Sequence, residues 1–102
     1  MSEDNQNLTR LQSAKSALQG RQAKYALELL GPLSANGAGS AEVYELAGLA
    51  HAMLGNSDHA RTFFKQSLAK EPGRITAHFN FALFLVAIKE YDEASEENQA
   101  VL

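Results

Sequence analysis

The sequence has no cysteine, no excess of basic residues and no long apolar run. Without cysteine, neither a disulfide framework nor a thiolate metal site can form. The formal net charge of −3 disfavours a nucleic-acid partner, which usually meets a basic surface. The longest apolar run, residues 81–88, is too short to cross a bilayer, and the polar, acidic residues 1–7 do not resemble a signal peptide. We therefore expect a cytoplasmic protein that inserts into no membrane.

The composition favours one domain built of helices. Apolar residues make up 45% of the 102 residues and charged residues 21%, as in ordinary globular proteins. Alanine is abundant and tryptophan is absent. Such a balance is typical of helices that pack closely through small side chains.

The sequence matches itself at an offset of 34 residues. Small residues coincide at two positions in each of three units: Ala14, Gly48 and Ala82, then Ala26, Ala60 and Ala94. No insertion is needed to keep this register. We define a polar tail over 1–6 and a repeat domain over 7–102, with units 7–40, 41–74 and 75–102, the last of them truncated.

Each unit divides into two helical stretches. Gly20, Gly55-Asn56 and Lys89-Glu90 mark the turns within the units, and 36–40 and Pro72-Gly73 the breaks between them. The expected helices follow from these breaks: 7–19, 22–35, 41–54, 57–70, 74–88 and 91–102.

The length of the unit and its motif resemble the tetratricopeptide repeat family. The middle unit carries the motif best, with Tyr44, Ala47, Gly48, His51, Ala60, Phe64 and Pro72. The third unit matches at His78, Phe81, Ala82, Leu85, Tyr91 and Ala94, but Asn98 stands where a large apolar residue belongs, and the first unit matches least. The resemblance implies an all-α, right-handed superhelical solenoid of antiparallel helix pairs, with about six helices. It also implies a concave side lined by the first helix of each unit.

One stripe of the first helices is a candidate peptide-binding or partner-binding surface. If the motif residues of 41–54 pack inward, helical spacing places the opposite stripe on the concave side. Much of that stripe is apolar, and exposed apolar patches usually mark interaction sites. The candidate residues are Lys15, Glu42, Glu45, Leu46, Leu49, Met53, Phe79, Asn80, Leu83 and Val86. In this hypothesis Asn80 bonds the ligand backbone, and Lys15, Glu42 and Glu45 form the rim.

The alternative is that the same residues are core. Residues 79–88 are apolar nearly all round, which is typical of a buried helix. A following unit or a second subunit would then cover them.

The sequence offers no catalytic constellation, so we expect no enzyme and no cofactor. We predict that His51 and His78 lie on packing faces and His59 in solvent, with no metal site. The acidic residues of 90–97 fit a solvated outer face. Some members of the family bind acidic C-terminal tails through a carboxylate clamp on the concave side. The matching positions here are Leu11, Lys15, Leu46, Thr76 and Asn80. Only Lys15 is basic, so we do not expect such a clamp.

The leading functional prediction is a non-catalytic protein–protein interaction module that binds a peptide or an amphipathic helix of another protein. Two alternatives stay open. One is a self-associating scaffold, a homo-oligomer held by an uncapped C-terminal helix, since repeat arrays usually end in a polar cap. The other is an accessory N-terminal segment of a larger enzyme or membrane protein, and we expect the chain to be a fragment.

Overall fold

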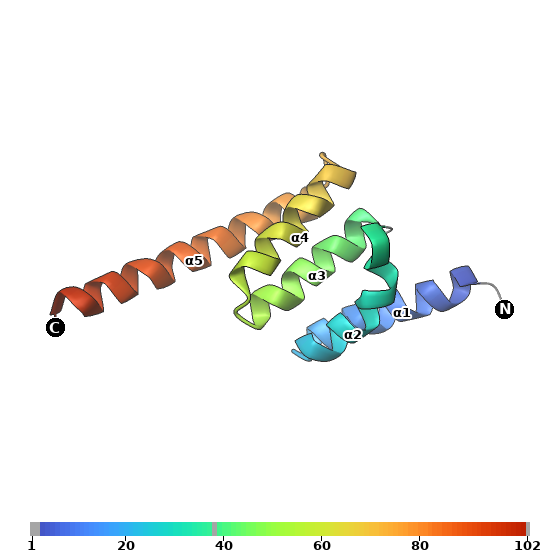
Figure 1. The fold of residues 1–102 in the computed structure, drawn as a ribbon, viewed down its shortest axis with the longest axis horizontal. Helices are drawn as coiled ribbons and strands as arrows, with labels where there is room; N and C mark the ends of the chain where they lie inside the picture. The colour runs from blue at the N-terminus through green and yellow to red at the C-terminus, as the bar shows by residue number, and fades with distance from the viewer. Residues whose placement is uncertain (1–2, 38, 102) are drawn as a thin grey trace.

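The computed structural model describes residues 3–37 and 39–101, and it describes side chains for 6–35, 37 and 39–89. Within these residues the chain is all-α, without strands, as predicted (Figure 1). The elements in chain order are α1 (Glu3–Gln19), α2 (Ala23–Ser34), the 3₁₀ turn η1 (Ala35–Gly37), α3 (Ala41–Met53), α4 (Ser57–Lys70) and α5 (Ile75–Val101).

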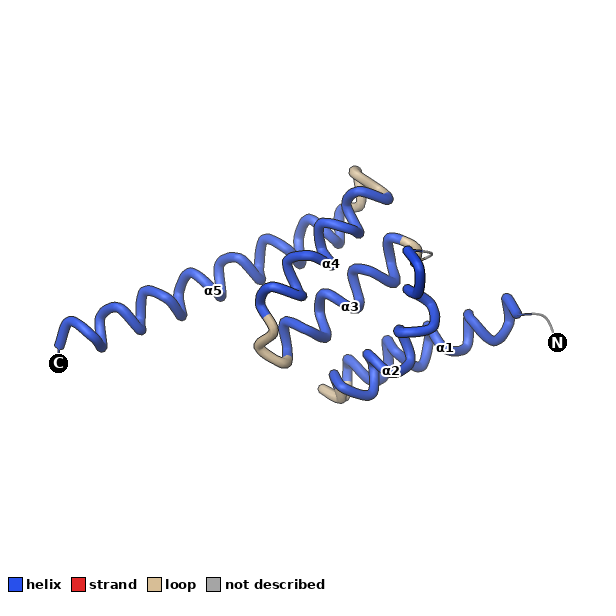
Figure 2. Tube along the Cα trace, in the orientation of Figure 1, coloured by secondary structure: helices blue, strands red, loops and turns tan. Residues whose placement is uncertain are grey.

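The first four helices form two helical hairpins, α1–α2 and α3–α4, joined by contacts between α2 and α3 (Figure 2). The first part of α5 lies against α4 and also contacts α3, while its C-terminal part extends away from the other helices (Figure 1). One core cluster fills the space among α1, α2 and α3, and a second joins α4 to α5. The molecule is accordingly elongated, with principal extents of 61 × 27 × 22 Å.

The turns around α3 lie where the sequence predicts them. The hydroxyl of Ser40 caps α3 by accepting a hydrogen bond from the Val43 N–H at 3.2 Å. At the other end Gly55 has a φ of 78°, the left-handed conformation that closes many helices. The Asn56 N–H then donates to the His51 carbonyl at 2.9 Å, which satisfies a carbonyl of the last turn.

The turn between α1 and α2 begins at Gly20, as predicted. The positive φ of this turn, 59°, belongs to the next residue, Arg21. Arg21 lies 34 residues before Gly55, so the repeat register places the two turns correctly and only the residue type departs. A left-handed backbone is unfavourable for a residue with a Cβ, by about 1–2 kcal/mol. The α1–α2 hairpin forms in spite of this, because Ala23, Ala26 and Leu30 of α2 are buried.

The α3–α4 hairpin packs through the motif residues, as predicted. Gly48 is buried against Phe64, and a Cβ at Gly48 would lie 3.0 Å from two carbons of the Phe64 ring. Phe64 and Ala60 have no exposed surface, and Tyr44 is buried as well. The buried Ser67 hydroxyl donates to the Ala41 carbonyl at 2.7 Å and ties the end of α4 to the start of α3.

The prediction of a turn at Lys89-Glu90 is wrong. A single helix, α5, spans the two stretches predicted over 74–88 and 91–102, so five α-helices replace the predicted six. Lys and Glu are both good helix formers, and Lys89 stands where Gly55 and Arg21 make the other turns. The stretch after the expected turn also offers little apolar surface to a hairpin, since Asn98 occupies the position of Phe64.

The uninterrupted α5 leaves one of its faces uncovered in the described part of the chain. His78, Ala82 and Leu85 correspond in the repeat to Tyr44, Gly48 and His51 of α3. The helix α4 covers the corresponding face of α3, but the three residues of α5 are exposed. The prediction that they pack within a third hairpin is therefore wrong, because that hairpin does not close.

Candidate partner-binding surface

The predicted binding stripe falls into a closed part and an open part. On α3, Glu45 and Leu46 are buried, Glu42 and Leu49 are half-buried, and Met53 is exposed. The burial of Glu45 and Leu46 removes them from any open surface. The physical reason is that α1 and α5 both contact α3 along this stripe.

The charged residues predicted at the rim bind one another. Lys15 Nζ lies 2.8 Å from Glu42 Oε2, which joins α1 to α3. Arg74, in the turn before α5, lies 3.8 Å from Glu42 and 3.5 Å from Glu45, and it also reaches Glu71 at 3.8 Å. These five residues form an ion-pair cluster that links α1 and α3 to the turn between α4 and α5. The three of them predicted at the rim of a ligand groove, Lys15, Glu42 and Glu45, are thus paired with oppositely charged side chains of the same chain.

The ion-pair cluster is incompletely satisfied. Glu45 Oε1 and Arg74 Nε are buried without a hydrogen-bond partner among the described atoms. Buried charges left partly unpaired are costly, so the cluster is sensitive to changes in either residue. Arg74 lies outside the predicted stripe. Its repeat equivalent is the helix-capping Ser40, so the register gave no sign of its role.

The open part of the stripe lies mainly on α5. Phe79 is 63% exposed, Leu83 53% and Val86 55%, and Met53 of α3 is also exposed. Leu49 is half-buried and packs against both core clusters, so it joins the α3 and α5 portions. We define the open apolar surface as Leu49, Met53, Phe79, Leu83 and Val86.

Two further residues bear on this surface. Asn80, predicted to bond the ligand backbone, is half-buried beside Phe79. Ile75 is 81% exposed, and sequence analysis missed it. Its spacing of four residues from Phe79 is the signal that could have identified it, because residues i and i+4 share one face of a helix.

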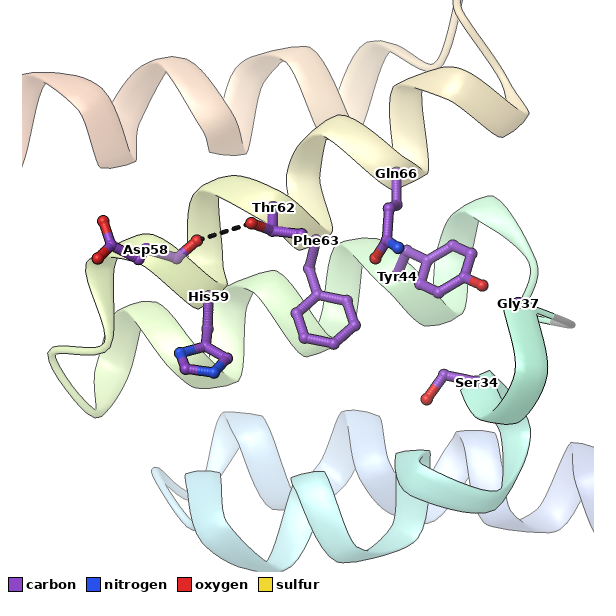
Figure 3. Close-up of a pocket in the computed structure, with 8 residues that line it drawn as sticks. All are labelled: Ser34, Gly37, Tyr44, Asp58, His59, Thr62, Phe63 and Gln66. Atoms are coloured by element: carbon purple, nitrogen blue, oxygen red, sulfur yellow. Dashed lines mark hydrogen bonds between the residues drawn. The ribbon is translucent and has the colours of Figure 1, made fainter.

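A separate pocket of about 400 Å³ lies between α4 and α2 (Figure 3). Tyr44, His59 and Phe63 point into it from α3 and α4, and Ser34 faces them from the end of α2. The rings form a column: Tyr44 to Phe63 at 6.1 Å, Phe63 to His51 at 5.3 Å and His51 to His59 at 4.9 Å. Packing of the rings on one another accounts for this column without a ligand.

The three histidines have different environments. His51 packs as predicted, and burial followed by the charge of His59 lowers its pKa below the usual 6.5. His59 is exposed, as predicted, although its ring stacks on His51. His78 is exposed and not packed, and its Nε2 donates a hydrogen bond to the Pro72 carbonyl at 2.7 Å. No group of three or more metal-ligating side chains occurs among the residues described.

No helix in the described part of the chain is long and apolar enough to span a membrane. Comparison with protein-family models, with curated proteins and with solved structures finds no match for the chain.

Proposed function

We propose that the protein is a non-catalytic interaction module of the tetratricopeptide type, and that its open apolar surface binds an amphipathic helix of a protein partner. The observation that carries the proposal is the exposure of Phe79, Leu83 and Val86 on one helix. Three large apolar side chains so exposed on consecutive turns are unfavourable in water unless a partner covers them.

The neighbouring residues suit a helical ligand. Leu49 of α3 packs against the core cluster that includes Phe84 of α5, and Met53 is exposed one turn further along α3. A helical ligand could therefore place its apolar side chains along both helices. Met53 adds a flexible side chain that adapts to different ligand shapes. At one end of α3 the ion-pair cluster links α1 and α3 to the turn before α5, beside the helices that carry the surface.

Capture from an extract of the source cell tests the proposal. We compare the intact protein with a Leu49→Glu, Leu83→Glu double variant, which places two charges in the open apolar surface. The control is Tyr25→Glu, a half-exposed aromatic residue on α2. Circular dichroism checks that all three proteins keep their helix content.

The expected result is a partner held by the intact protein and by the Tyr25→Glu control but lost by the double variant. Equal capture by all three proteins would contradict the proposal and assign binding to another surface, such as the pocket between α2 and α4.

A further inference from the structure

The exposed face of α5 has the spacing of a coiled-coil seam. Ile75, Phe79, Ala82 and Val86 follow one another at intervals of four, three and four residues, and all four are exposed. This alternation keeps side chains on one line when two helices wrap around each other. The next position in the series is Lys89, so the apolar seam covers about three turns of the helix.

The seam lies on the side of α5 opposite its own protein core. Among the described side chains of α5, those of Ala77 and Phe84 are buried, and they lie about half a turn around the helix from Ile75 and Val86. A second helix on the seam therefore meets no other helix of the same chain.

We infer that the seam binds a second copy of this chain, α5 against α5 in antiparallel orientation, with the two Ala82 residues at the crossing point. This inference rests on the proposed function, for which it names the partner. A two-fold contact needs a surface that is complementary to itself, so that residue i meets j and j meets i. An antiparallel pair centred on Ala82 places Phe79 of each copy opposite Val86 of the other, and Ile75 opposite Lys89.

Side-chain size fits this pairing. The small side chain of Ala82 allows the two helices to approach closely at the centre. The large Phe79 then lies beside the smaller Val86 at two symmetric positions, so neither end of the seam brings two phenylalanines together. The aliphatic part of Lys89 can cover Ile75 while its ammonium group stays in water.

Charge selects the antiparallel orientation over the parallel one. Residues 90–97 of α5 carry five acidic and no basic side chains: Glu90, Asp92, Glu93, Glu96 and Glu97. Parallel pairing would bring the two acidic segments together, and like charges at close range repel. Antiparallel pairing separates the two acidic segments.

Sedimentation equilibrium tests self-association. A seam of this size predicts a weak dimer, with a Kd on the order of 10 µM. The apparent mass should rise from the monomer value of 11.1 kDa toward twice that value as the concentration increases from about 1 to about 500 µM. Ala82→Arg should abolish the rise, and Tyr25→Arg, a change of the same charge on α2, should leave it intact. A monomer mass at the highest concentration would overturn the inference.

Disulfide trapping tests the orientation. The chain has no cysteine of its own, so a single introduced cysteine can bridge only to another copy. Antiparallel pairing predicts that a mixture of Phe79→Cys and Val86→Cys proteins forms mainly the mixed disulfide. Predominance of the two homodimeric disulfides would overturn the antiparallel arrangement.

The Leu49→Glu variant separates this inference from the proposed function. Leu49 belongs to the open apolar surface but not to the seam, so the variant should dimerise normally. If the intact protein is monomeric and still captures another protein in a Leu49-dependent manner, the second copy is wrong as the partner and the proposed function stands. If it dimerises but captures nothing that depends on Leu49, the seam is an interface between copies. The proposal that the open apolar surface binds another protein is then wrong.

Discussion

Replacement of Phe64 by alanine should destabilise the protein more than any change on the open apolar surface. Phe64 of α4 has no exposed surface, and it contacts two other helices, α3 and α5. Its ring touches Gly48 of α3 and lies 5.4 Å from the Phe81 ring and 5.7 Å from the Phe84 ring of α5. Phe64→Ala therefore opens a cavity at the point where α3, α4 and α5 meet.

The expected loss in the free energy of unfolding is about 3–5 kcal/mol, the usual result for a fully buried phenylalanine. For a domain of this size the total is only about 5–15 kcal/mol. With an m-value of about 2 kcal/mol/M, the urea midpoint should fall by about 2 M. Circular dichroism at the helix band, followed through a urea titration, measures this shift.

Tyr25→Ala is the matched control, because half of that side chain is exposed, and its midpoint should move by about 0.25 M or less. A fall of less than about 0.5 M for Phe64→Ala would refute the reasoning. It would mean that α5 is not held to α4 through this ring, and the exposure of the opposite face of α5 would then need another explanation.

Three further changes test the local structure. Arg21→Gly should raise the free energy of unfolding by about 0.5–1 kcal/mol, because glycine accepts the positive φ without strain, and thermal unfolding would show this; a loss would contradict it. Arg74→Met should lower the free energy of unfolding by about 1–3 kcal/mol, because Glu45 stays buried without its partner, and adding Glu45→Leu should recover part of the loss in the same urea assay. Because the folded protein disfavours protonation of His51, the unfolded chain binds more protons below pH 6.5. Stability from His51 should therefore be present above pH 6.5 and be lost as the pH falls, and His51→Gln should flatten that part of a stability–pH curve; an unchanged slope would contradict the assignment.

Much of the helical framework could be predicted from the sequence, because the repeat register carries the information. Helices α2, α3 and α4 begin and end within one residue of their predicted bounds, and α1 begins four residues earlier, at Glu3. The small and aromatic motif residues of the α3–α4 hairpin are buried as predicted. The superhelical arrangement and membership of the tetratricopeptide family stay predictions.

The continuous helix α5 could not be predicted, because the repeat register indicates where a turn belongs but not whether the turn forms. The first unit turns at Arg21 against its backbone preference, since α2 has apolar residues to bury. The third unit has helix formers at Lys89-Glu90 and the polar Asn98 where the hairpin needs an apolar residue. A continuous helix therefore forms in place of a hairpin. That balance depends on surface burial, which a repeat alignment does not measure.

The candidate site was predicted in part. Phe79, Leu83 and Val86 lie outside the core of the described chain, and the alternative that a following unit or a second subunit covers them stays open. The helical spacing of the residues could not predict that Glu42, Glu45 and Lys15 form ion pairs with one another and with Arg74. Those contacts depend on how closely α1 and α5 approach α3, and a single-helix pattern contains no such information.

Photo-cross-linking at Leu83 tests the central claim most directly, because it reports what touches the open apolar surface. The residue is replaced by p-benzoylphenylalanine, the protein is irradiated in an extract of the source cell, and the cross-linked peptides are identified by mass spectrometry. Tyr25 carries the same probe as the control. We expect adducts at Leu83 to an apolar helical segment, whether of a second copy or of another protein, and few at Tyr25. Absence of adducts at Leu83, or an equal and unselective yield at both positions, would contradict it.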